Sequence, residues 1–229
     1  MRISGLQKLT LMDFPEVVSC IIFTQGCNFR CPFCHNASLV GGVGDNEISE
    51  DEVLDFLKER KKLLDGVVIT GGEPTLNSDI AEFLKKIKNL GYLIKLDTNG
   101  TNPDLLKKLV SDKLVDYVAM DIKNCPEKYE KATGVNKFME KVTQSKDFLL
   151  TGAIDYEFRT TVVKGIHTKD DLISLAKWIA GANKYFLQQY KNSGDIISPE
   201  GLSSFSEEEM NDFLSAVSPI INSSKIRNL

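Results

Sequence analysis

Strand-like and helix-like segments alternate along most of the chain, and this alternation constrains the fold more than any other feature of the sequence. The first expected strand, residues 17–24, is a mostly apolar run rich in β-branched residues. Runs of this kind are typical of strands that are buried on both faces of a sheet. Five more strands are expected at residues 66–70, 92–98, 115–122, 154–163 and 184–190.

Helical segments separate these strands. Ser49 and Glu52 form a capping box that opens a helix reaching about residue 64, and Ser206 with Glu209 forms another before a last helix toward residue 221. The other helices are expected at residues 78–90, 102–110, 126–150 (in two pieces broken at Gly134) and 168–181.

Strands that alternate with crossover helices form a parallel sheet with right-handed connections and helices on its outside. Six such units predict an α/β fold, an open and partial TIM-like (β/α)6 barrel with parallel strands. We expect one domain over residues 1–229, in which residues 191–229 form a C-terminal extension that begins as a loop.

Composition limits the classes of partner. The chain has 28 Lys and Arg against 32 Asp and Glu, a net charge of -4, so it lacks the electrostatic footprint of a non-specific nucleic-acid binder. No stretch approaches the ~18 apolar residues of a membrane span, and the first fifteen residues lack the apolar core of a signal peptide. We expect a cytoplasmic protein that binds neither nucleic acid nor membrane and that is a monomer when no partner protein is bound.

Residues that do not look like core collect where the expected strands end. They are the cysteines after residue 24, the segment Gly71-Gly72-Glu73-Pro74, the segment 97–100 and the segment 121–123. Parallel α/β sheets bind their ligands at the carboxyl ends of the strands, so one pocket could collect all of these residues.

Three of the five cysteines stand close together, with the spacing C-x3-C-x2-C at Cys27, Cys31 and Cys34. Clustered thiols in a reducing compartment indicate a metal centre. A structural zinc site would add His35 or a distant ligand to complete a tetrahedron. An iron-sulfur cluster held by three thiolates would instead keep one iron open for a substrate or cofactor. Spacing alone leaves both possibilities open.

The same residues resemble the signature of the radical S-adenosylmethionine (SAM) superfamily, in which an aromatic residue, here Phe33, precedes the last cysteine of the loop. Gly71-Gly72-Glu73-Pro74 is similar to the glycine-glycine-glutamate motif of that superfamily. Within it, the chain resembles the activating enzymes of glycyl-radical enzymes, and residues 5–15 are most similar to activators of anaerobic ribonucleotide reductases. The subgroup resemblance rests on the segments Cys34-His35-Asn36, Asp97-Thr98-Asn99-Gly100 and Asp121-Ile122-Lys123, and on Arg159.

The resemblance implies a 4Fe-4S cluster whose open iron binds SAM. Reductive cleavage of SAM would give a 5'-deoxyadenosyl radical that removes a hydrogen atom from a glycine of a partner enzyme. The implied partners are a glycyl-radical enzyme, most similar in type to an anaerobic ribonucleotide reductase, and a flavodoxin or ferredoxin as electron donor. An activator of a formate-lyase-type enzyme, or an enzyme acting on a small molecule such as a deazapurine precursor, are the alternatives.

The resemblance also implies residue roles. The three cysteines would hold the cluster, with Phe33, His35 and Asn36 beside it. Gly71 and Gly72 would let the backbone approach the methionyl group of SAM, because glycine has no Cβ, and Glu73 would face its ammonium. The remaining implied SAM contacts are Asp97, Thr98, Asn99, Asp121, Lys123 and Arg159, with a monovalent cation near Asp97, Thr98 and Asp121.

Three residues with reactive side chains are expected to be structural. Cys20 lies inside an apolar strand and is interpreted as a core residue, and Cys125 as a loop thiol. His167 is expected beside a helix cap at Thr168. The last strand has no histidine to meet adenine, so the ribose and adenine contacts there are left unassigned.

Overall fold

The computed structural model describes residues 1–41, 47–192 and 195–227, and its strands form one eight-stranded sheet in sequence order. Each strand from β3 to β8 runs parallel to the one before it, whereas β1 pairs with β2 in the antiparallel sense. The strands are β1 (Ile3–Thr10), β2 (Ser19–Thr24), β3 (Gly66–Gly71), β4 (Leu93–Thr98), β5 (Tyr117–Asp121), β6 (Asp155–Val162), β7 (Tyr185–Gln189) and β8 (Ser224–Arg227).

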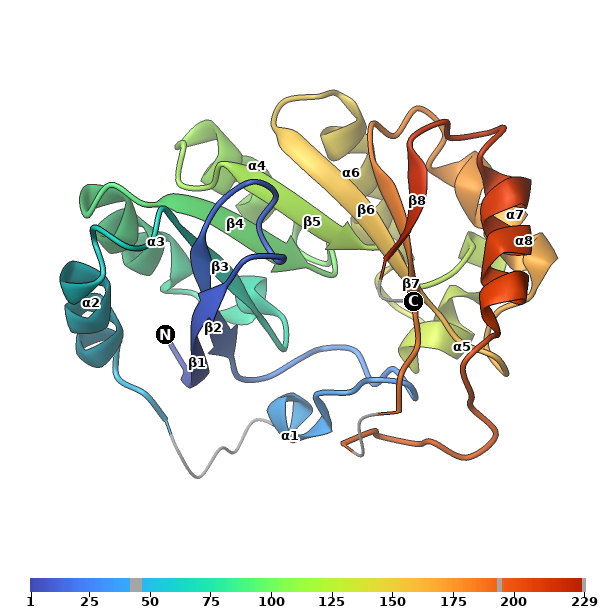
Figure 1. Cartoon of the computed structure of the whole chain (residues 1–229), viewed down its shortest axis with the longest axis horizontal. Coiled ribbons are helices and arrows are strands. Elements are labelled where there is room, and N and C mark those ends of the chain that lie inside the picture. Colours follow the sequence, from blue (N-terminus) through green and yellow to red (C-terminus); the bar gives the residue numbers. More distant parts are fainter. Residues whose placement is uncertain (42–46, 193–194, 228–229) are drawn as a thin grey trace.

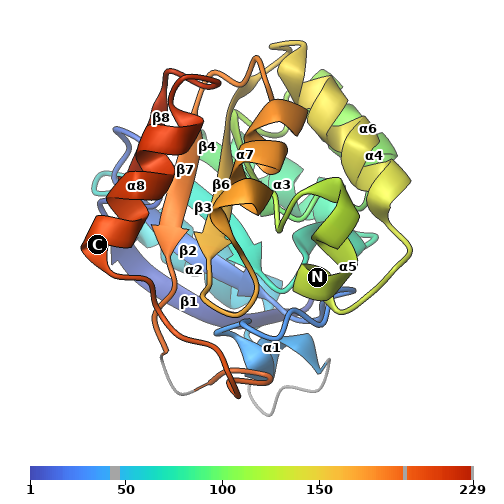
Figure 2. The same cartoon turned by 90° about the vertical axis from the view of Figure 1, so that its right-hand side faces the viewer.

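The sheet curves into an open barrel with helices on its outer side (Figures 1 and 2). The α-helices are α1 (Ala37–Val40), α2 (Glu50–Glu59), α3 (Ile80–Asn89), α4 (Pro103–Ser111), α5 (Tyr129–Thr133), α6 (Met139–Leu150), α7 (Lys169–Trp178) and α8 (Glu207–Val217). Two short 3-10 helices, η1 (Pro74–Leu76) and η2 (Pro126–Lys128), follow β3 and β5. The predicted open α/β barrel is confirmed.

Local sequence signals explain where the helices begin. Ser49 and Ser206 form the predicted capping boxes at the start of α2 and α8, and Thr168 forms a third at the start of α7. In each box a hydroxyl and a carboxylate satisfy backbone N–H groups that have no partner within the helix. The predicted break in the segment 126–150 is also found, because Gly134 ends α5 in the left-handed conformation at φ 69°.

Two strands were not expected from the sequence, and the sheet is correspondingly larger than six strands. β1 is an edge strand with polar and partly exposed residues, and β8 has only four residues. Neither has the continuous apolar pattern of a buried strand. The six predicted strands correspond to β2–β7 and are parallel as expected, β1 adds an antiparallel strand at one edge, and β8 extends the parallel part with residues of the C-terminal extension.

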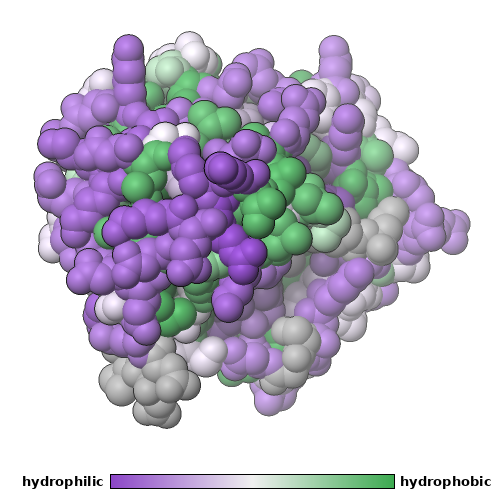
Figure 3. Space-filling view, turned by 60° about the vertical axis from the view of Figure 1, so that its left-hand side comes forward, coloured by the Kyte–Doolittle hydropathy of each residue, from purple (hydrophilic) through white to green (hydrophobic). Residues whose placement is uncertain are grey.

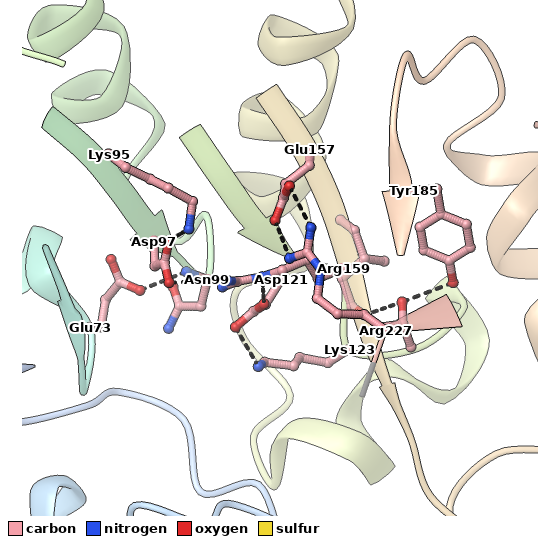
Figure 4. A network of polar contacts seen from close by, with 12 residues as sticks. Glu73, Lys95, Asp97, Asn99, Asp121, Lys123, Glu157, Arg159, Tyr185 and Arg227 are labelled. Atoms are coloured by element: carbon pink, nitrogen blue, oxygen red, sulfur yellow. Dashed lines mark hydrogen bonds and ion pairs between the residues drawn. The ribbon is translucent and has the colours of Figure 1, made fainter. Parts of the chain in front are cut away.

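The inner face of the barrel changes character along the strands. Phe14, Ile21, Val68 and Tyr117 form a small apolar cluster there. Polar and charged side chains follow toward the carboxyl ends of β4, β5 and β6 (Figure 4). These polar and charged side chains therefore lie on the carboxyl-end side of the apolar cluster. None of the helices in the described ranges has the length and apolar character needed to cross a bilayer.

The edge strand β1 contributes to the core despite its polar composition, so we predict that Ile3→Ala lowers the free energy of unfolding by about 2–5 kcal/mol. Ile3 is fully buried, whereas Leu9, near the other end of the same strand, is 55% exposed. Leu9→Ala is the matched control and should change stability by less than about 0.5 kcal/mol. Urea denaturation followed by circular dichroism measures both, and equal losses would contradict the burial of β1.

Candidate active site

All fifteen residues that the sequence assigned to the site line one cavity of about 560 Å³ at the carboxyl ends of the strands. This volume lies within the ~300–1,000 Å³ range of small-molecule sites. The cysteine loop (residues 25–36) follows β2, Gly71 ends β3 and is followed by Gly72 and Glu73, and the other members lie in or just after β4, β5 and β6. The predicted single pocket is thus found.

The three loop cysteines face this cavity as thiols. Cys31 is 6% exposed, and burial raises the pKa of Cys31 to about 12 and that of Cys27 to about 11. Lys123 acts in the opposite direction on both thiols, because its positive charge favours the thiolate. Buried thiols of this kind need a cation or metal to become thiolates.

The glycine pair after β3 packs against the cysteine loop itself. A Cβ at Gly72 would lie 2.0 Å from the carbonyl oxygen of Gly26, and Gly71 has φ 109° with the backbone of Thr24 on the site of its missing Cβ. The N–H of Glu73 donates to the same Gly26 carbonyl at 2.8 Å. The sequence analysis attributed these glycines to close approach of a ligand, but the structure gives them an intramolecular reason.

The carboxylate of Glu73 is 1% exposed and ties the end of β3 to the end of β4. It accepts hydrogen bonds from the hydroxyl and N–H of Thr75, from the hydroxyl of Thr98 at 2.7 Å, and from the N–H of Asn99 at 2.6 Å. Burial raises the pKa of Glu73, although these donors offset part of the effect. Glu73 therefore lines the cavity as a cross-link between two strand ends.

A chain of ion pairs crosses the inner face from β4 to the end of β5 (Figure 4). Arg159 stands at its centre and donates to Asp97 at 3.0 Å and to Asp121 at 2.9 Å. Lys95 binds the other oxygen of Asp97 at 2.6 Å, and Lys123 binds the other oxygen of Asp121 at 3.0 Å. Each carboxylate oxygen thus has one cationic partner.

The ion pairs outweigh burial in setting the charge of these groups. Burial by itself would raise the pKa values of Asp97 and Asp121, but Arg159 and the neighbouring lysines lower both below the ordinary aspartate value. Burial would lower the pKa of Lys123, and Asp121 raises it above the ordinary lysine value. Asp97, Asp121 and Lys123 are therefore charged at neutral pH.

His167 links the cysteine loop to the end of β5. Its Nδ1 accepts a hydrogen bond from the N–H of Val163 at 3.1 Å, so Nε2 carries the proton and donates to the carbonyl of Lys123 at 2.8 Å. Its ring meets Phe33 edge-on at 6.2 Å. Burial lowers the pKa of His167. The predicted place beside the α7 cap is confirmed, and the contacts with Phe33 and Lys123 are additional.

His35 and Asn36 end the cysteine loop and also line the cavity. Burial and the charge of Lys123 lower the pKa of His35. Asn36 precedes α1 without making a side-chain cap. The side chains of both residues therefore remain available to a molecule in the cavity or at its entrance.

Further contacts hold the cysteine loop at regular intervals. Asn28 bonds through its side chain to Asn99 and Thr101, both at 2.8 Å. The N–H of Arg30 donates to the carbonyl of Thr133 at 2.8 Å, and a Cβ at Gly134 would lie 2.5 Å from the carbonyl oxygen of Arg30. These supports come from residues far away in sequence, so no local sequence signal predicted them.

The C-terminal extension reaches the same loop. The N–H of Ser198 donates to the carbonyl of Pro32 at 3.0 Å, and the carboxylate of Asp195 accepts from the N–H and hydroxyl of Ser38 at 3.2 and 2.9 Å. Residues 195–198 therefore fasten the outer side of the cysteine loop and the start of α1.

The wall of the cavity that β6 and β7 provide was not predicted from the sequence. Thr161, Gln188, Gln189, Tyr190 and Lys191 line it. The buried hydroxyl of Tyr190 has no hydrogen-bond partner within the described part of the chain. Thr161 could have been found, because it lies two residues after Arg159 and therefore on the same strand face.

The donor set fits a cluster held at three corners. Three thiol side chains come from one short loop, and charged or polar side chains line the cavity around them. Across residues 1–41, 47–192 and 195–227, no three His, Cys, Asp or Glu side chains are grouped to hold a single metal ion. An iron-sulfur cluster distributes its thiolates over separate iron atoms.

Comparison with known proteins gives these residues a context. The family model described as the Radical SAM superfamily matches residues 21–179. The chain is 34% identical to a protein of Methanocaldococcus jannaschii named as a glycyl-radical enzyme activating enzyme, over 82% of this chain and 80% of that protein. It is 31% identical to the pyruvate formate-lyase-activating enzyme of Clostridium pasteurianum, over 59% of this chain and 58% of that enzyme.

A relative that is named for a different activity matches over a smaller part of both chains than the Methanocaldococcus jannaschii protein does. The chain is 30% identical to a protein of Thermococcus kodakarensis named as a GTP 3',8-cyclase, over 68% of this chain and 52% of that protein. Among solved structures, SuiB of Streptococcus suis bound to S-adenosylmethionine superposes with a TM-score of 0.70 at 15% identity, over 90% of this chain and 48% of SuiB. That superposition supports the fold.

The contact between Gly72 and Gly26 yields a prediction. Gly72→Ala forces the cysteine loop away from β3, and we expect it to destabilise the chain by more than about 1 kcal/mol and to lower the iron bound per chain after anaerobic reconstitution. Gly41→Ala is the matched control, because a Cβ there would meet nothing within 4 Å. Equal iron content in the two variants would show that the loop does not depend on this contact.

Proposed function

The chain belongs to the radical SAM superfamily, and we propose that it activates a glycyl-radical enzyme by removing a hydrogen atom from a glycine of that partner. The observation that carries the proposal is the joining of Cys27, Cys31 and Cys34 with the Gly71-Gly72-Glu73 loop in one cavity. The relative that is named as an activating enzyme, similar over 80% of its length, supports the same activity. Membership in this family removes the basis for a zinc module.

We propose that the three cysteines hold a 4Fe-4S cluster and that the cavity beside them holds SAM. When bound, the cluster supplies the electron that cleaves SAM to methionine and a 5'-deoxyadenosyl radical. The chain's own residues bind and orient SAM and exclude water from the site. The apolar side chains of Ile21 and Val68, at the inner end of the cavity, serve this exclusion.

The charged chain around Arg159 suits the polar end of SAM, which carries an ammonium and a carboxylate. Lys123 or Arg159 can exchange an aspartate partner for the ligand carboxylate, and Asp121 or Asp97 can then accept from the ligand ammonium. A monovalent cation beside Asp97, Thr98 and Asp121 would have to compete with the same cationic side chains.

The nucleoside end of SAM suits the opposite wall. Thr161 and Gln188 line the cavity from β6 and β7 and carry polar groups that can bind a ribose or an adenine. These two side chains can make the ribose and adenine contacts that the sequence left unassigned, because the last predicted strand has no histidine. A test is the affinity for SAM of Gln188→Leu compared with that of the parent chain.

The exposed turn between β1 and β2 favours a protein as the second substrate. Leu9, near the end of β1, is 55% exposed, and Leu11 and Met12 are 70% and 83% exposed. Hydrophobic surface is exposed in patches among mostly hydrophilic side chains on the face of the molecule in Figure 3. Gln7 and Asp13, on either side of these residues, line the cavity. Exposed apolar side chains at a cavity entrance are typical of a protein contact.

An anaerobic ribonucleotide reductase is the proposed partner, because residues 5–15 resemble its activators. A formate-lyase-type enzyme is the second candidate, supported by the relative from Clostridium pasteurianum. A flavodoxin or ferredoxin is the proposed electron donor.

Electron paramagnetic resonance tests the activity directly. The reconstituted chain, SAM, a reductant and the candidate reductase should give a glycine-centred doublet, and α-deuterated glycine in the partner should transfer deuterium to 5'-deoxyadenosine. Cys31→Ala should give neither signal. If 5'-deoxyadenosine stays unlabelled with both candidate partners while GTP or another small molecule accelerates SAM cleavage, the proposal is wrong.

The turn yields a separate prediction. Leu11→Ser with Met12→Ser should raise the partner concentration needed for half-maximal activation by about tenfold, because burying exposed apolar side chains in an interface contributes favourably to affinity. SAM cleavage without partner should change less than about twofold. Leu63→Ser, 62% exposed but remote from the turn in sequence, is the matched control. A double variant that activates the partner like the control would exclude the turn from docking.

A further inference from the structure

A second ion pair lies on the inner face of the barrel, below the chain that is centred on Arg159. Arg227, in the last strand, donates to both oxygens of Glu157 at 2.8 and 3.0 Å. The side chain of Glu157 is 1% exposed and that of Arg227 is 27% exposed. Tyr117 also donates to Glu157, at 3.1 Å. Neither Glu157 nor Arg227 was predicted from the sequence to belong to the site.

The pair is adjacent to the proposed SAM contacts. Glu157 and Arg159 lie two residues apart on β6, so their side chains point to the same face (Figure 4). Phe186 of β7 is the register partner of Arg159, and the guanidinium of Arg227 stacks on the Phe186 ring at 3.7 Å. Arg227 therefore contacts both a neighbour of Arg159 across the sheet and the carboxylate beside it on the strand.

The carboxylate of Glu157 already acts on Arg159. Burial alone would lower the pKa of Arg159, but Asp121, Asp97 and then Glu157 raise it. A buried carboxylate requires a cationic partner. If Arg227 were removed, Arg159, two residues along the same strand face, would be a cation toward which the unpaired Glu157 carboxylate could pull, in competition with Asp97 and Asp121.

We propose that Arg227 is a positioning residue for the active site: by satisfying Glu157, it keeps the Arg159 guanidinium on Asp97 and Asp121, where it meets SAM. This inference rests on the proposed function for its effect on SAM, but the position of Arg159 itself can be measured without cluster or ligand. Through Arg227, the strand β8 of the C-terminal extension would help to organise the site, although β8 is far from the other site residues in sequence.

Two measurements on three variants test this role. In the cluster-free chain, the Nε–Hε resonance of Arg159, assigned with Arg159→Lys, reports its hydrogen bond to Asp121 by NMR. We expect Arg227→Met to shift or broaden that resonance, and Glu157→Gln with Arg227→Met to restore it, because no buried carboxylate then competes. Glu157→Gln alone should leave it near its parent position.

SAM affinity of the reconstituted, unreduced enzyme is the second measurement. Arg227→Met should weaken binding by about tenfold or more, and the double variant should bind within about threefold of the parent. If Arg227→Met does not fold, Arg227→Gln takes its place with the same expectation.

The outcomes separate the inference from the proposed function. An unchanged Arg159 resonance in Arg227→Met, or a double variant as weak as the single one, overturns the positioning role and leaves Arg227 a structural residue of β8. A parent chain that fails to bind SAM contradicts the proposed function instead, while the resonance still decides whether Arg227 positions Arg159.

Discussion

The site depends on how an irregular loop is held in place. The cysteine loop has no helix or strand of its own before α1, yet almost every second residue is fastened to another part of the barrel: Gly26 to the end of β3, Asn28 to the end of β4, Arg30 to the α5 end and Pro32 to the C-terminal extension. These bonds compensate the loss of chain entropy that a loop of defined shape requires. They also hold the three cysteines in place through the neighbouring residues of the loop.

The ion pairs inside the barrel follow from the same architecture. Parallel strands end at one edge of the sheet, so Asp97, Asp121 and Arg159 meet although they lie far apart in sequence. A buried charge requires a partner of opposite sign. Because several strands contribute charged side chains, these side chains pair across neighbouring strands. Together they form the network of Figure 4.

Much of this arrangement could be predicted from the sequence, because strand ends and the cysteine spacing are local signals. The three loop cysteines and Glu73 were predicted to share a pocket with Asp97, Asp121, Lys123 and Arg159, and they do. The edge strand β1, Arg227 in β8 and the supports of the loop at Asn28 and Gly134 could not be predicted, because each depends on a contact between distant segments. The close packing of Gly72 on Gly26 is of the same kind: the motif was recognised, but its physical reason lies in a tertiary contact.

The charged groups around Arg159 are paired before any ligand arrives, with each aspartate oxygen already bound to a cation. A molecule that enters must therefore trade partners with existing salt links rather than displace loosely held water. Such an exchange rewards a zwitterion, which returns a positive and a negative group to the side chains it separates. A neutral nucleoside has nothing to return to these ion pairs, so they favour a zwitterion over a neutral ligand.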